Sequence, residues 1–513
     1  MREVQSMEAV ELGAHLTLPE VVAVARHGAR VVLTPEVRQR VARASEMVER
    51  LVRERRPVYG ITTGFGKFSD VPISAEQTEA LQRNLLMSHA CAVGEPLAAE
   101  VVRAMLLLRA QALSRGHSGI RAETLEMLVA FLNLGLTPVV PEQGSLGASG
   151  DLAPLAHMSL PLIGLGEAVV NGERLSGAEA LQRVGLRPLT LTAKEGLALI
   201  NGTQAMTALG SLGLHDAQVL LKTADIAAAM TAEALGAIPA AWDPRVQALR
   251  LHTGQQAAAR NLRRLTEGSR LTTRPGQMRT QDPYTLRCLP QVHGASRTAI
   301  EHVAQVLDWE MNAVTDNPLL FPDDDEVISG GNFHGQPVAL ALDYLAIAVA
   351  ELGDIAERRI ERLVNPQLSG LPAFLTRNGG VHSGLMITQY TAASLVSENK
   401  VLAHPASVDS IPSSANQEDH VSMGTTAARK ARQVIANVRR VLAIELLCAA
   451  QALEFVGPER LAPATRAAYA AIRERVAPLS GDRVLAPDIE ALAELVHNGE
   501  LVAAVEAVAG PLE

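Results

Sequence analysis

The chain has 513 residues, of which 48% are hydrophobic and only 3% aromatic, and Ala, Leu and Val dominate the apolar content. Small and unbranched side chains lose little freedom in a helix, so this composition favours packed helices over sheet. A net charge of −9 without any block of Lys or Arg argues against nucleic acid or an anionic membrane as a partner.

The N-terminus lacks the features of a targeting segment. Residues 1–15 carry three glutamates and no apolar stretch, so no signal peptide is predicted. The longest weakly charged stretch, 336–350, is too short to span a bilayer. The three cysteines are far apart, which fits a reducing compartment, and Cys91 is expected to be buried and inert. We therefore expect a soluble cytoplasmic protein.

The first third of the chain alternates helices with glycine-rich loops. A helix is predicted from Pro35, because Thr34 can cap it and proline suits the first helical turn. A loop broken by three glycines follows over 59–66, and helical patterns resume over 76–91 and 97–115.

The middle of the chain predicts long helices. One apolar row has the four- and three-residue steps of a helix–helix seam: Val338, Leu342, Leu345, Val349, Leu352, Ala356, Ile360 and Leu363. Leu340, Ile347 and Ile355 lie off this seam, so several neighbours should bury the helix, which indicates the centre of an oligomer. Another long helix is predicted from after Asp419 to about Phe455.

These patterns predict a mainly α fold built as one continuous unit with three regions. Residues 1–210 form a region of shorter helices that carries the glycine-rich loops. A bundle of long antiparallel helices follows over 211–456, and short helices broken by proline and glycine occupy 457–513.

The loop over 59–66 does not have the pattern of a phosphate-binding loop. Such a loop ending at Gly66 and Lys67 would need Gly at the position of Ile61 and Ser or Thr at that of Phe68. Two interpretations stay open. The loop is a structural turn, or its glycines bring the backbone close to a small ligand, with Tyr59 at the rim.

The second glycine-rich loop contains Ala148, Ser149 and Gly150, a tripeptide that alone suggests a structural turn. It also permits an unusual cyclisation. If the Gly150 nitrogen attacks the Ala148 carbonyl, loss of two waters, one of them the Ser149 hydroxyl, gives a methylidene-imidazolone. Glycine avoids crowding at the nucleophilic nitrogen, and Gly144 and Gly147 permit the bent backbone that ring closure needs.

Seven stretches, in order along nearly the whole chain, together resemble the aromatic amino acid ammonia-lyases: 59–66, 84–90, 144–157, 201–204, 281–291, 329–336 and 414–424. The resemblance implies a mainly helical homotetramer whose active sites draw residues from three chains. It also implies that Ala148, Ser149 and Gly150 become the methylidene-imidazolone, which would make the substrate nitrogen a better leaving group.

The resemblance assigns further roles by position. Tyr59 matches the base that removes the β-proton; because a free tyrosine has a pKa near 10, such a base needs positive charge or helix N-termini nearby. Arg287 would bind the substrate carboxylate as a planar bidentate donor. The remaining implied site residues, which orient the substrate, support the electrophile or line the pocket, are Gly66, Asn201, Gln281, Tyr284 and Phe333.

Substrate choice depends on Ser88, His89 and Glu418. An imidazole needs polar partners, and a carboxylate pairs naturally with it. The family's phenylalanine lyases have apolar residues at the first two positions, its tyrosine lyases have His then Leu, and both commonly have Gln where this chain has Glu418. The predicted reaction is therefore elimination of ammonia from L-histidine to give trans-urocanate, which begins histidine degradation. Glu418 would either bind the imidazole or transfer protons.

Several alternatives remain. A phenylalanine or tyrosine ammonia-lyase, or an aminomutase, would use the same electrophile. An inactive helical scaffold is the next alternative, but a scaffold would not need the Ala-Ser-Gly tripeptide, Tyr59 or Arg287. A metal hydrolase is disfavoured, because the 14 histidines include no HExxH or HxH pattern and the acidic run 323–326 is interpreted as a solvated loop. Neither a metal nor pyridoxal phosphate is predicted, since none of the five lysines lies in a recognised pyridoxal phosphate site.

Overall fold

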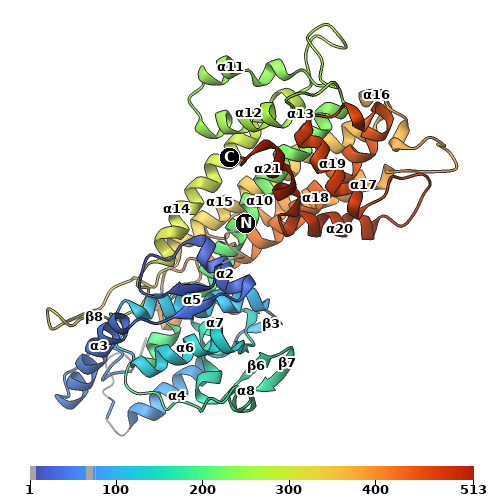
Figure 1. The fold of residues 1–513 in the computed structure, drawn as a ribbon. Helices are drawn as coiled ribbons and strands as arrows, with labels where there is room; N and C mark the ends of the chain where they lie inside the picture. Colours follow the sequence, from blue (N-terminus) through green and yellow to red (C-terminus); the bar gives the residue numbers. More distant parts are fainter. Residues whose placement is uncertain (1–6, 65–72, 75–76) are drawn as a thin grey trace. The chain divides into compact units, whose positions relative to one another are not determined.

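The computed structural model describes residues 7–64, 73–74 and 77–513, and it is mainly helical, as predicted (Figure 1). The chain divides into two compact units. Unit 1 comprises the described residues of Met1–Leu212, Ala304–Asp343 and Pro405–Arg429, and unit 2 comprises Gly213–Val303, Tyr344–His404 and Lys430–Glu513.

Unit 1 combines short helices with small sheets. Its helices are α2 (Leu18–His27), α3 (Pro35–Arg53), α4 (Thr78–His89), α5 (Ala99–Ser114), α6 (Ala122–Leu134), α7 (Leu152–Ser159), η3 (Leu160–Ile163), α8 (Gly177–Arg183), α9 (Glu195–Ile200) and η6 (Ser414–Asn416). Its strands are β1 (Ala9–Glu11), β2 (Arg30–Val32), β3 (Val93–Pro96), β4 (Thr137–Pro138), β5 (Pro141–Gln143), β6 (Glu167–Val170), β7 (Glu173–Ser176), β8 (Leu319–Phe321) and β9 (Glu326–Ile328).

Unit 2 is built from helices in its described residues. They are η4 (Pro239–Trp242), α11 (Pro244–Ala248), α12 (Thr253–Leu265), α13 (Tyr284–Arg287), α16 (Pro366–Ser369), η5 (Ala373–Leu375), α17 (Met386–Leu402), η7 (Pro458–Arg460), α19 (Pro463–Arg475), α20 (Ala486–His497) and α21 (Glu500–Ala509). Four longer helices have residues in both units: α10 (Gln204–Ala234), α14 (Leu289–Met311), α15 (Gln336–Val364) and α18 (Gly424–Val456).

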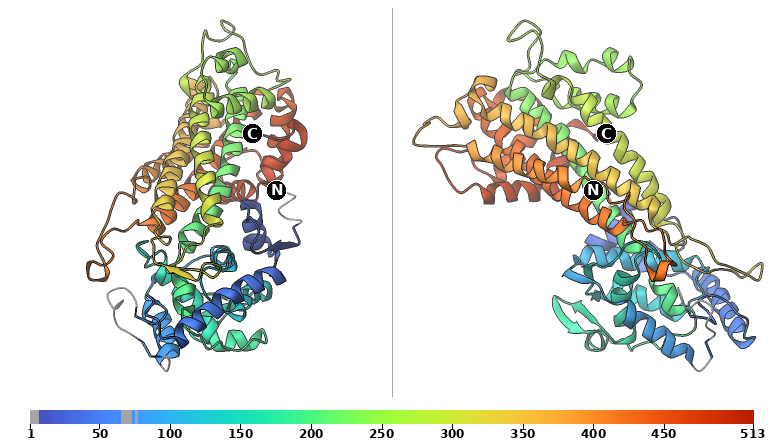
Figure 2. Two further views of the ribbon diagram at one scale, coloured as in Figure 1. Left: turned by 90° about the vertical axis from the view of Figure 1, so that its left-hand side faces the viewer. Right: turned by 180° about the vertical axis from the view of Figure 1, so that it is seen from behind.

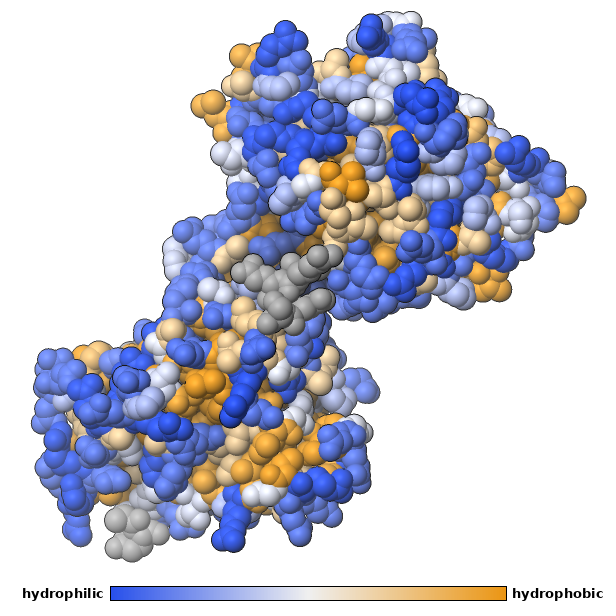
Figure 3. All heavy atoms as spheres, in the orientation of Figure 1, coloured by the Kyte–Doolittle hydropathy of each residue, from blue (hydrophilic) through white to orange (hydrophobic). Residues whose placement is uncertain are grey.

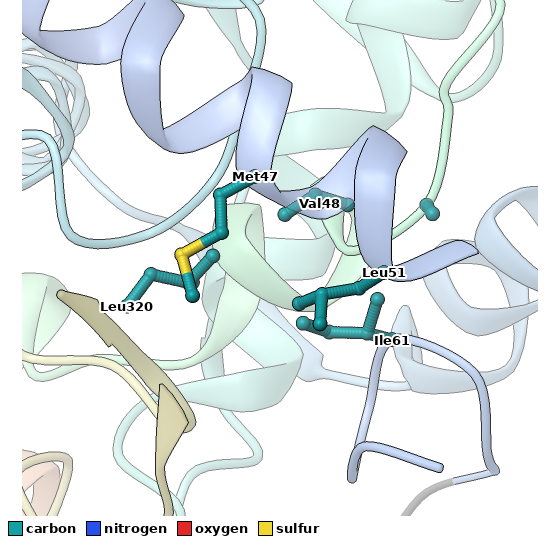
Figure 4. Close-up of a cluster of buried hydrophobic side chains, with 6 residues drawn as sticks. Met47, Val48, Leu51, Ile61 and Leu320 are labelled. Carbon is teal, nitrogen blue, oxygen red and sulfur yellow. The ribbon is translucent and has the colours of Figure 1, made fainter. Parts of the chain in front are cut away.

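Helix α3 begins where the sequence predicts. The Thr34 side chain accepts a hydrogen bond from the Val37 backbone nitrogen, and Pro35 occupies the first turn. The buried face of α3 contributes Met47, Val48 and Leu51 to a small apolar cluster (Figure 4). The other members of this cluster are Ile61, Ala193 and Leu320. Because Ile61 belongs to this cluster, the loop that carries Tyr59 is anchored to α3.

The small sheets tie distant segments of unit 1 together. Strands β3 and β5 pair antiparallel, which joins the segment after α4 to the segment that enters the loop at Gly144. Strands β8 and β9 form a hairpin in which Leu319 pairs with Ile328, so the residues before β8 and after β9 meet. Asn317 and Gly330 lie at this junction, where the Asn317 Oδ1 accepts the Gly330 backbone N–H at 2.8 Å.

The long helices lie side by side in unit 2 (Figure 2) and share a buried polar network. Arg359 of α15 donates to both carboxylate oxygens of Glu445 on α18, at 2.6 and 2.7 Å, and Thr231 of α10 donates to the same carboxylate. His293 of α14 contacts Asp225 of α10 at 2.7 Å. Every side chain that would carry a charge here has a partner, which offsets the cost of burial.

The predicted seam of α15 is confirmed, because all eight of its apolar residues are 0% exposed. Of the residues off the seam, Ile355 is buried, whereas Leu340 and Ile347 are 54% and 46% exposed on this chain. Helix α18 begins at Gly424 and ends at Val456, close to its predicted limits.

The accessible surface is mainly hydrophilic on the face in Figure 3, with smaller apolar areas on each unit. No helix in the described residues is long and apolar enough to cross a membrane. The expectation that Cys91 is buried is wrong: the thiol is exposed, because the chain leaves α4 at this point and runs along the surface toward β3.

Candidate functional site

Unit 1 contains a cavity of about 940 Å³ that is lined by segments far apart in the sequence. Seven of the predicted site residues lie in its wall: Tyr59, His89, Ala148, Ser149, Asn201, Phe333 and Glu418. Gly150 lines a second cavity of about 230 Å³, which shares Ala148 and Ser149 with the first. The fold thus brings most of the predicted residues together.

The loop that carries Ala148, Ser149 and Gly150 has a backbone that requires glycine at two positions. Gly147 and Gly150 have φ angles of +71° and +72°, in the left-handed region that other residues rarely adopt. A Cβ on Gly150 would collide with the Gly202 carbonyl oxygen, and a Cβ on Gly147 would collide with the Ser422 hydroxyl. The loop is therefore both bent and closely packed.

Asp151 anchors the C-terminal side of this loop. Its backbone N–H donates to the Gly202 carbonyl at 2.7 Å, and its fully buried carboxylate accepts from Ser145 Oγ at 2.7 Å and from the Met206 N–H at 2.9 Å. The Thr425 hydroxyl is a further donor to the same carboxylate. Burial raises the pKa of Asp151, while these hydrogen bonds act in the opposite direction.

Glu418 contacts the loop directly. Its Oε1 accepts a hydrogen bond from Ser149 Oγ at 2.8 Å, and its Oε2 accepts one from Ser413 Oγ at 2.9 Å. The backbones of Ser413 and Glu418 also pair with each other, which closes a short hairpin whose tip, residues 414–416, has φ angles between +51° and +66°. This closed turn fixes the carboxylate against Ser149.

Asn201 ends helix α9 and contacts the loop from another direction. Its side-chain amide donates to the Ser149 carbonyl oxygen at 2.9 Å, and the side chain is almost fully buried. The residue after it, Gly202, forms an isolated parallel bridge with Gly150. The short turn after α9, residues 201–202, therefore packs against the loop and supports it.

His89 is the last residue of α4 and is held in one tautomer. Its Nδ1 lies 2.9 Å from the Leu85 carbonyl oxygen, which can only accept, so Nδ1 carries the hydrogen and Nε2 is an acceptor. Burial lowers the pKa of His89, and the Leu85 hydrogen bond and the charge of Glu418 oppose this shift. His89 is therefore a neutral hydrogen-bonding group in this wall.

Other residues in the wall were not singled out from the sequence: Asn84, Asn317, His334, Gln417 and His420. His334 and His420 stack with ring centroids 5.7 Å apart, and His334 Nε2 lies 3.2 Å from the His420 carbonyl oxygen. Both histidines fall within stretches that carry the family resemblance, which was the available signal. Asn317 lies outside all of these stretches, and no sequence pattern indicated it.

Three predicted residues are absent from this cavity. Gln281, Tyr284 and Arg287 belong to unit 2 and are not among the described residues that form its wall. Arg287 lies 4.5 Å from the centre of the Tyr284 ring, and Tyr284 is 70% exposed. Gly66 lies outside the described residues. Within the described ranges, no group of three or more His, Cys, Asp or Glu side chains is arranged to hold a metal ion.

Comparison with known proteins agrees with this geometry. Residues 16–474 match the family described as aromatic amino acid lyase. The chain is 60% identical to the histidine ammonia-lyase of Alkaliphilus metalliredigens over 97% of this chain and 98% of that protein. Among solved structures it is similar to histidine ammonia-lyase from Trypanosoma cruzi (TM-score 0.91, 45% identity, 98% and 95% of the two chains). It is also similar to tyrosine aminomutase from Streptomyces globisporus (TM-score 0.93, 39% identity, 98% and 99%). The chain therefore belongs to the aromatic amino acid lyase family.

Proposed function

We propose that this protein eliminates ammonia from L-histidine to give trans-urocanate. One observation carries the proposal: Ser149, in a bent and closely packed Ala-Ser-Gly loop, contacts Glu418 in a cavity that His89 also lines. The loop supplies the means of activating an amine, and the two polar residues supply partners for an imidazole. The 60% identity to a histidine ammonia-lyase supports the same choice of substrate.

The residues of the loop fit a methylidene-imidazolone. Gly150 has a left-handed backbone and no room for a Cβ, so the nucleophilic nitrogen belongs to a residue that only glycine can supply here. Asn201 binds the Ser149 carbonyl oxygen, which would become the exocyclic carbonyl oxygen of the imidazolone after closure. Once formed, the ring would offer an electrophilic carbon to the substrate amine, and no metal or pyridoxal phosphate is required.

Tyr59 is the proposed base for the β-proton of the substrate. It lies half-buried in the cavity wall, next to Gly60, on the loop that Ile61 anchors to α3. A base held in one place on the wall can meet the β-carbon of a substrate whose amine is fixed at the loop 148–150. A positioned base of this kind contributes about 10²- to 10⁴-fold to a rate.

His89 and Glu418 favour an imidazole ring over a phenyl ring. The neutral His89 offers Nε2 as an acceptor, and Glu418 offers a carboxylate. Cyclisation would remove the Ser149 hydroxyl, which now donates to Glu418 Oε1, so this oxygen could then accept from the substrate. A phenyl ring can pair with neither acceptor, whereas the N–H of a neutral imidazole can pair with one of them, and each acceptor left unpaired costs about 1–3 kcal/mol.

We also propose a homotetramer whose active sites are completed by neighbouring subunits. In this assembly the active-site cavity of another subunit would be lined by Gln281, Tyr284 and Arg287. Arg287 would bind the substrate carboxylate there. The exposed apolar face of α15 supports this assembly, because Leu340, Tyr344 and Ile347 are 54%, 44% and 46% exposed and lie on one side of the helix. In the same proposal Gly66 and Phe333 complete the substrate pocket. We place the enzyme in the cytoplasm, where its unpaired cysteines would stay reduced.

The first test is ultraviolet absorbance and ammonia release after mixing the purified protein with L-histidine, L-phenylalanine or L-tyrosine. Urocanate and ammonia should form from histidine alone, and Ser149→Ala should remove this activity while leaving the oligomer intact. Deamination of phenylalanine or tyrosine instead would overturn the substrate assignment. Near-normal turnover by Ser149→Ala would overturn the electrophile.

An aminomutase is the second candidate, because tyrosine aminomutase has nearly the same fold. Such an enzyme would return the ammonia to the β-carbon of the substrate. Chromatographic analysis of the products separates the two reactions, since a β-amino acid would accumulate in place of urocanate and ammonia.

A further inference from the structure

Arg109 of α5 is a fully buried arginine that binds three separate segments of unit 1. Its Nε donates to the Ala198 carbonyl at 2.8 Å, and its Nη2 donates to the same oxygen. Its Nη1 donates to the Thr315 carbonyl at 2.8 Å and to Gln204 Oε1 at 3.1 Å. A planar fork with five N–H groups can hold all of these acceptors at once, which a lysine cannot do.

Arg109 binds the segment that supports the Ala148–Gly150 loop, namely α9 and the turn at 201–202. Ala198 lies in α9, one turn before Asn201, whose amide holds the Ser149 carbonyl oxygen. Gly202 follows, and a Cβ there would collide with Arg109 Nη1, so the guanidinium packs directly against this turn. On its other side the turn meets the loop, where the Gly202 carbonyl accepts the Asp151 N–H.

The charge balance around Arg109 is unusual for a purely structural core. Lys194 Nζ lies 2.9 Å and Arg109 Nη2 3.9 Å from the same Asp316 carboxylate oxygen, and all three side chains are fully buried. Burial lowers the pKa of Arg109 to about 10 and also lowers that of Lys194. Buried ion pairs are often no more stabilising than apolar packing, so stability alone does not explain why this cluster is charged.

We propose that Arg109 is a positioning residue for cyclisation of the Ala148–Gly150 loop. By fixing the turn at Asn201 and Gly202, it holds Ser149 and Gly150 in the bent shape in which the Gly150 nitrogen reaches the Ala148 carbonyl carbon. This inference rests on the proposed function, because that function needs the ring.

The chemical step that Arg109 assists is balanced without any further reactant. A C–N bond forms between the Gly150 nitrogen and the Ala148 carbonyl carbon. The Ala148 oxygen leaves as water with the amide hydrogens of Ser149 and Gly150. The second water comprises the Ser149 hydroxyl and the Ser149 α-hydrogen, and its loss creates the methylidene group. The mature subunit is therefore lighter by two waters.

The test is the intact mass of denatured subunits after purification, which reports ring closure independently of activity. Arg109→Lys keeps the charge but cannot span the three acceptors, so the rate at which new subunits lose two waters should fall at least about tenfold, since small misplacements of reacting groups can cost about 10²-fold in rate. The matched control is Arg103→Lys. Arg103 lies on the same helix and also binds backbone carbonyls, those of Val24 and Leu132, but it does not contact the turn at 201–202. Arg103→Lys should lose both waters normally.

Oligomer size and the midpoint of thermal unfolding show whether each variant is folded, and only folded variants are compared with the unaltered protein. A folded Arg109→Lys that loses both waters as fast as the unaltered protein would overturn the proposal. If Arg109→Lys does not fold, Gln204→Leu gives the second test, because Gln204 holds the guanidinium without touching the loop. It should slow the mass loss several-fold, and loss of both waters at the rate of the unaltered protein would overturn the proposal. Failure of the unaltered protein itself to lose two waters would instead refute the proposed function.

Discussion

Glu418 is the residue whose proposed role is most open to a direct test. Replacement by Gln keeps the size of the side chain and removes the charge, so an imidazole would lose its charged partner. A hydrogen bond to a charged group contributes about 1.5–3 kcal/mol, so kcat/KM for histidine should fall about 10- to 100-fold in Glu418→Gln. Asp419→Asn is the control, because this neighbouring carboxylate lines the same cavity without contacting Ser149 in the described structure. Equal losses in both variants would contradict a specific role for Glu418.

Tyr59→Phe tests the base. Removing the phenol oxygen should lower kcat by about 10²- to 10⁴-fold, while KM changes little, because the residue acts on the β-proton and not on the carboxylate or the imidazole. Loss of two waters should still be complete in this variant, which separates catalysis from ring closure. A large rise in KM with an unchanged kcat would mean that Tyr59 binds substrate.

At the level of residues, the sequence predicted the seven members of the cavity wall that family resemblance could assign by position. It did not predict Asn317, Ser413 or the cluster around Arg109. These residues act through distant partners, such as Gly330 for Asn317 and Ala198 for Arg109. Such pairings depend on the tertiary path of the chain, which no local spacing encodes.

Among the helices, we expect His293 of α14 to make unit 2 sensitive to acid. The buried ring bridges Asp225, which also pairs with Arg297, and Arg359, with the charge of Glu445 nearby, and burial lowers the pKa of His293 below the ordinary 6.5. The unfolded chain therefore binds a proton at a higher pH than the folded chain does. Stability should be full above about pH 6.5 and fall as the pH drops below it, until the pKa of the folded state is passed, by up to about 1.4 kcal/mol per pH unit.

The check on this prediction is the midpoint of thermal unfolding at pH 7.5 and at pH 5.5. His293→Gln can still donate to Asp225 and accept from Arg359, but it does not titrate, so the difference between the two midpoints should shrink. The same change at the exposed His27 should leave the difference as it is in the unaltered protein. An unchanged difference in His293→Gln would show that other groups cause the acid sensitivity.

The elements themselves follow the sequence most closely where the pattern is long or the cap is clear. The start of α3 was predictable from Thr34 and Pro35, and the buried row of α15 from its periodic apolar residues. The short strands β3 and β5 were not predictable. Each has four residues or fewer, and they form because the chain returns to the same place after two helices, so their pairing depends on the fold as a whole.

At the scale of the whole molecule, the shared active site can be tested by complementation. Ser149→Ala lacks the electrophile but keeps Arg287, whereas Arg287→Ala lacks the carboxylate ligand but keeps the electrophile. Each variant alone should be nearly inactive. Subunits mixed during co-expression should regain up to about one quarter of normal activity, because random assembly then places an intact loop and an intact Arg287 from different subunits at some sites.

Co-expression of Ser149→Ala with Tyr59→Phe is the matched control. Both residues lie in the same cavity of one unit, so no exchange of subunits can restore a complete site. Activity in this control, or its absence in the first mixture despite confirmed mixed oligomers, would contradict a site completed by a neighbouring subunit.

The hydrogen bond from Ser149 to Glu418 has a consequence for newly made protein in the cell. Until the serine reacts, its hydroxyl competes for the acceptor that we propose for the imidazole, so we expect an immature subunit to bind histidine more weakly than a mature one. The event that creates the reactive carbon also releases the acceptor, and binding and reactivity therefore arise together.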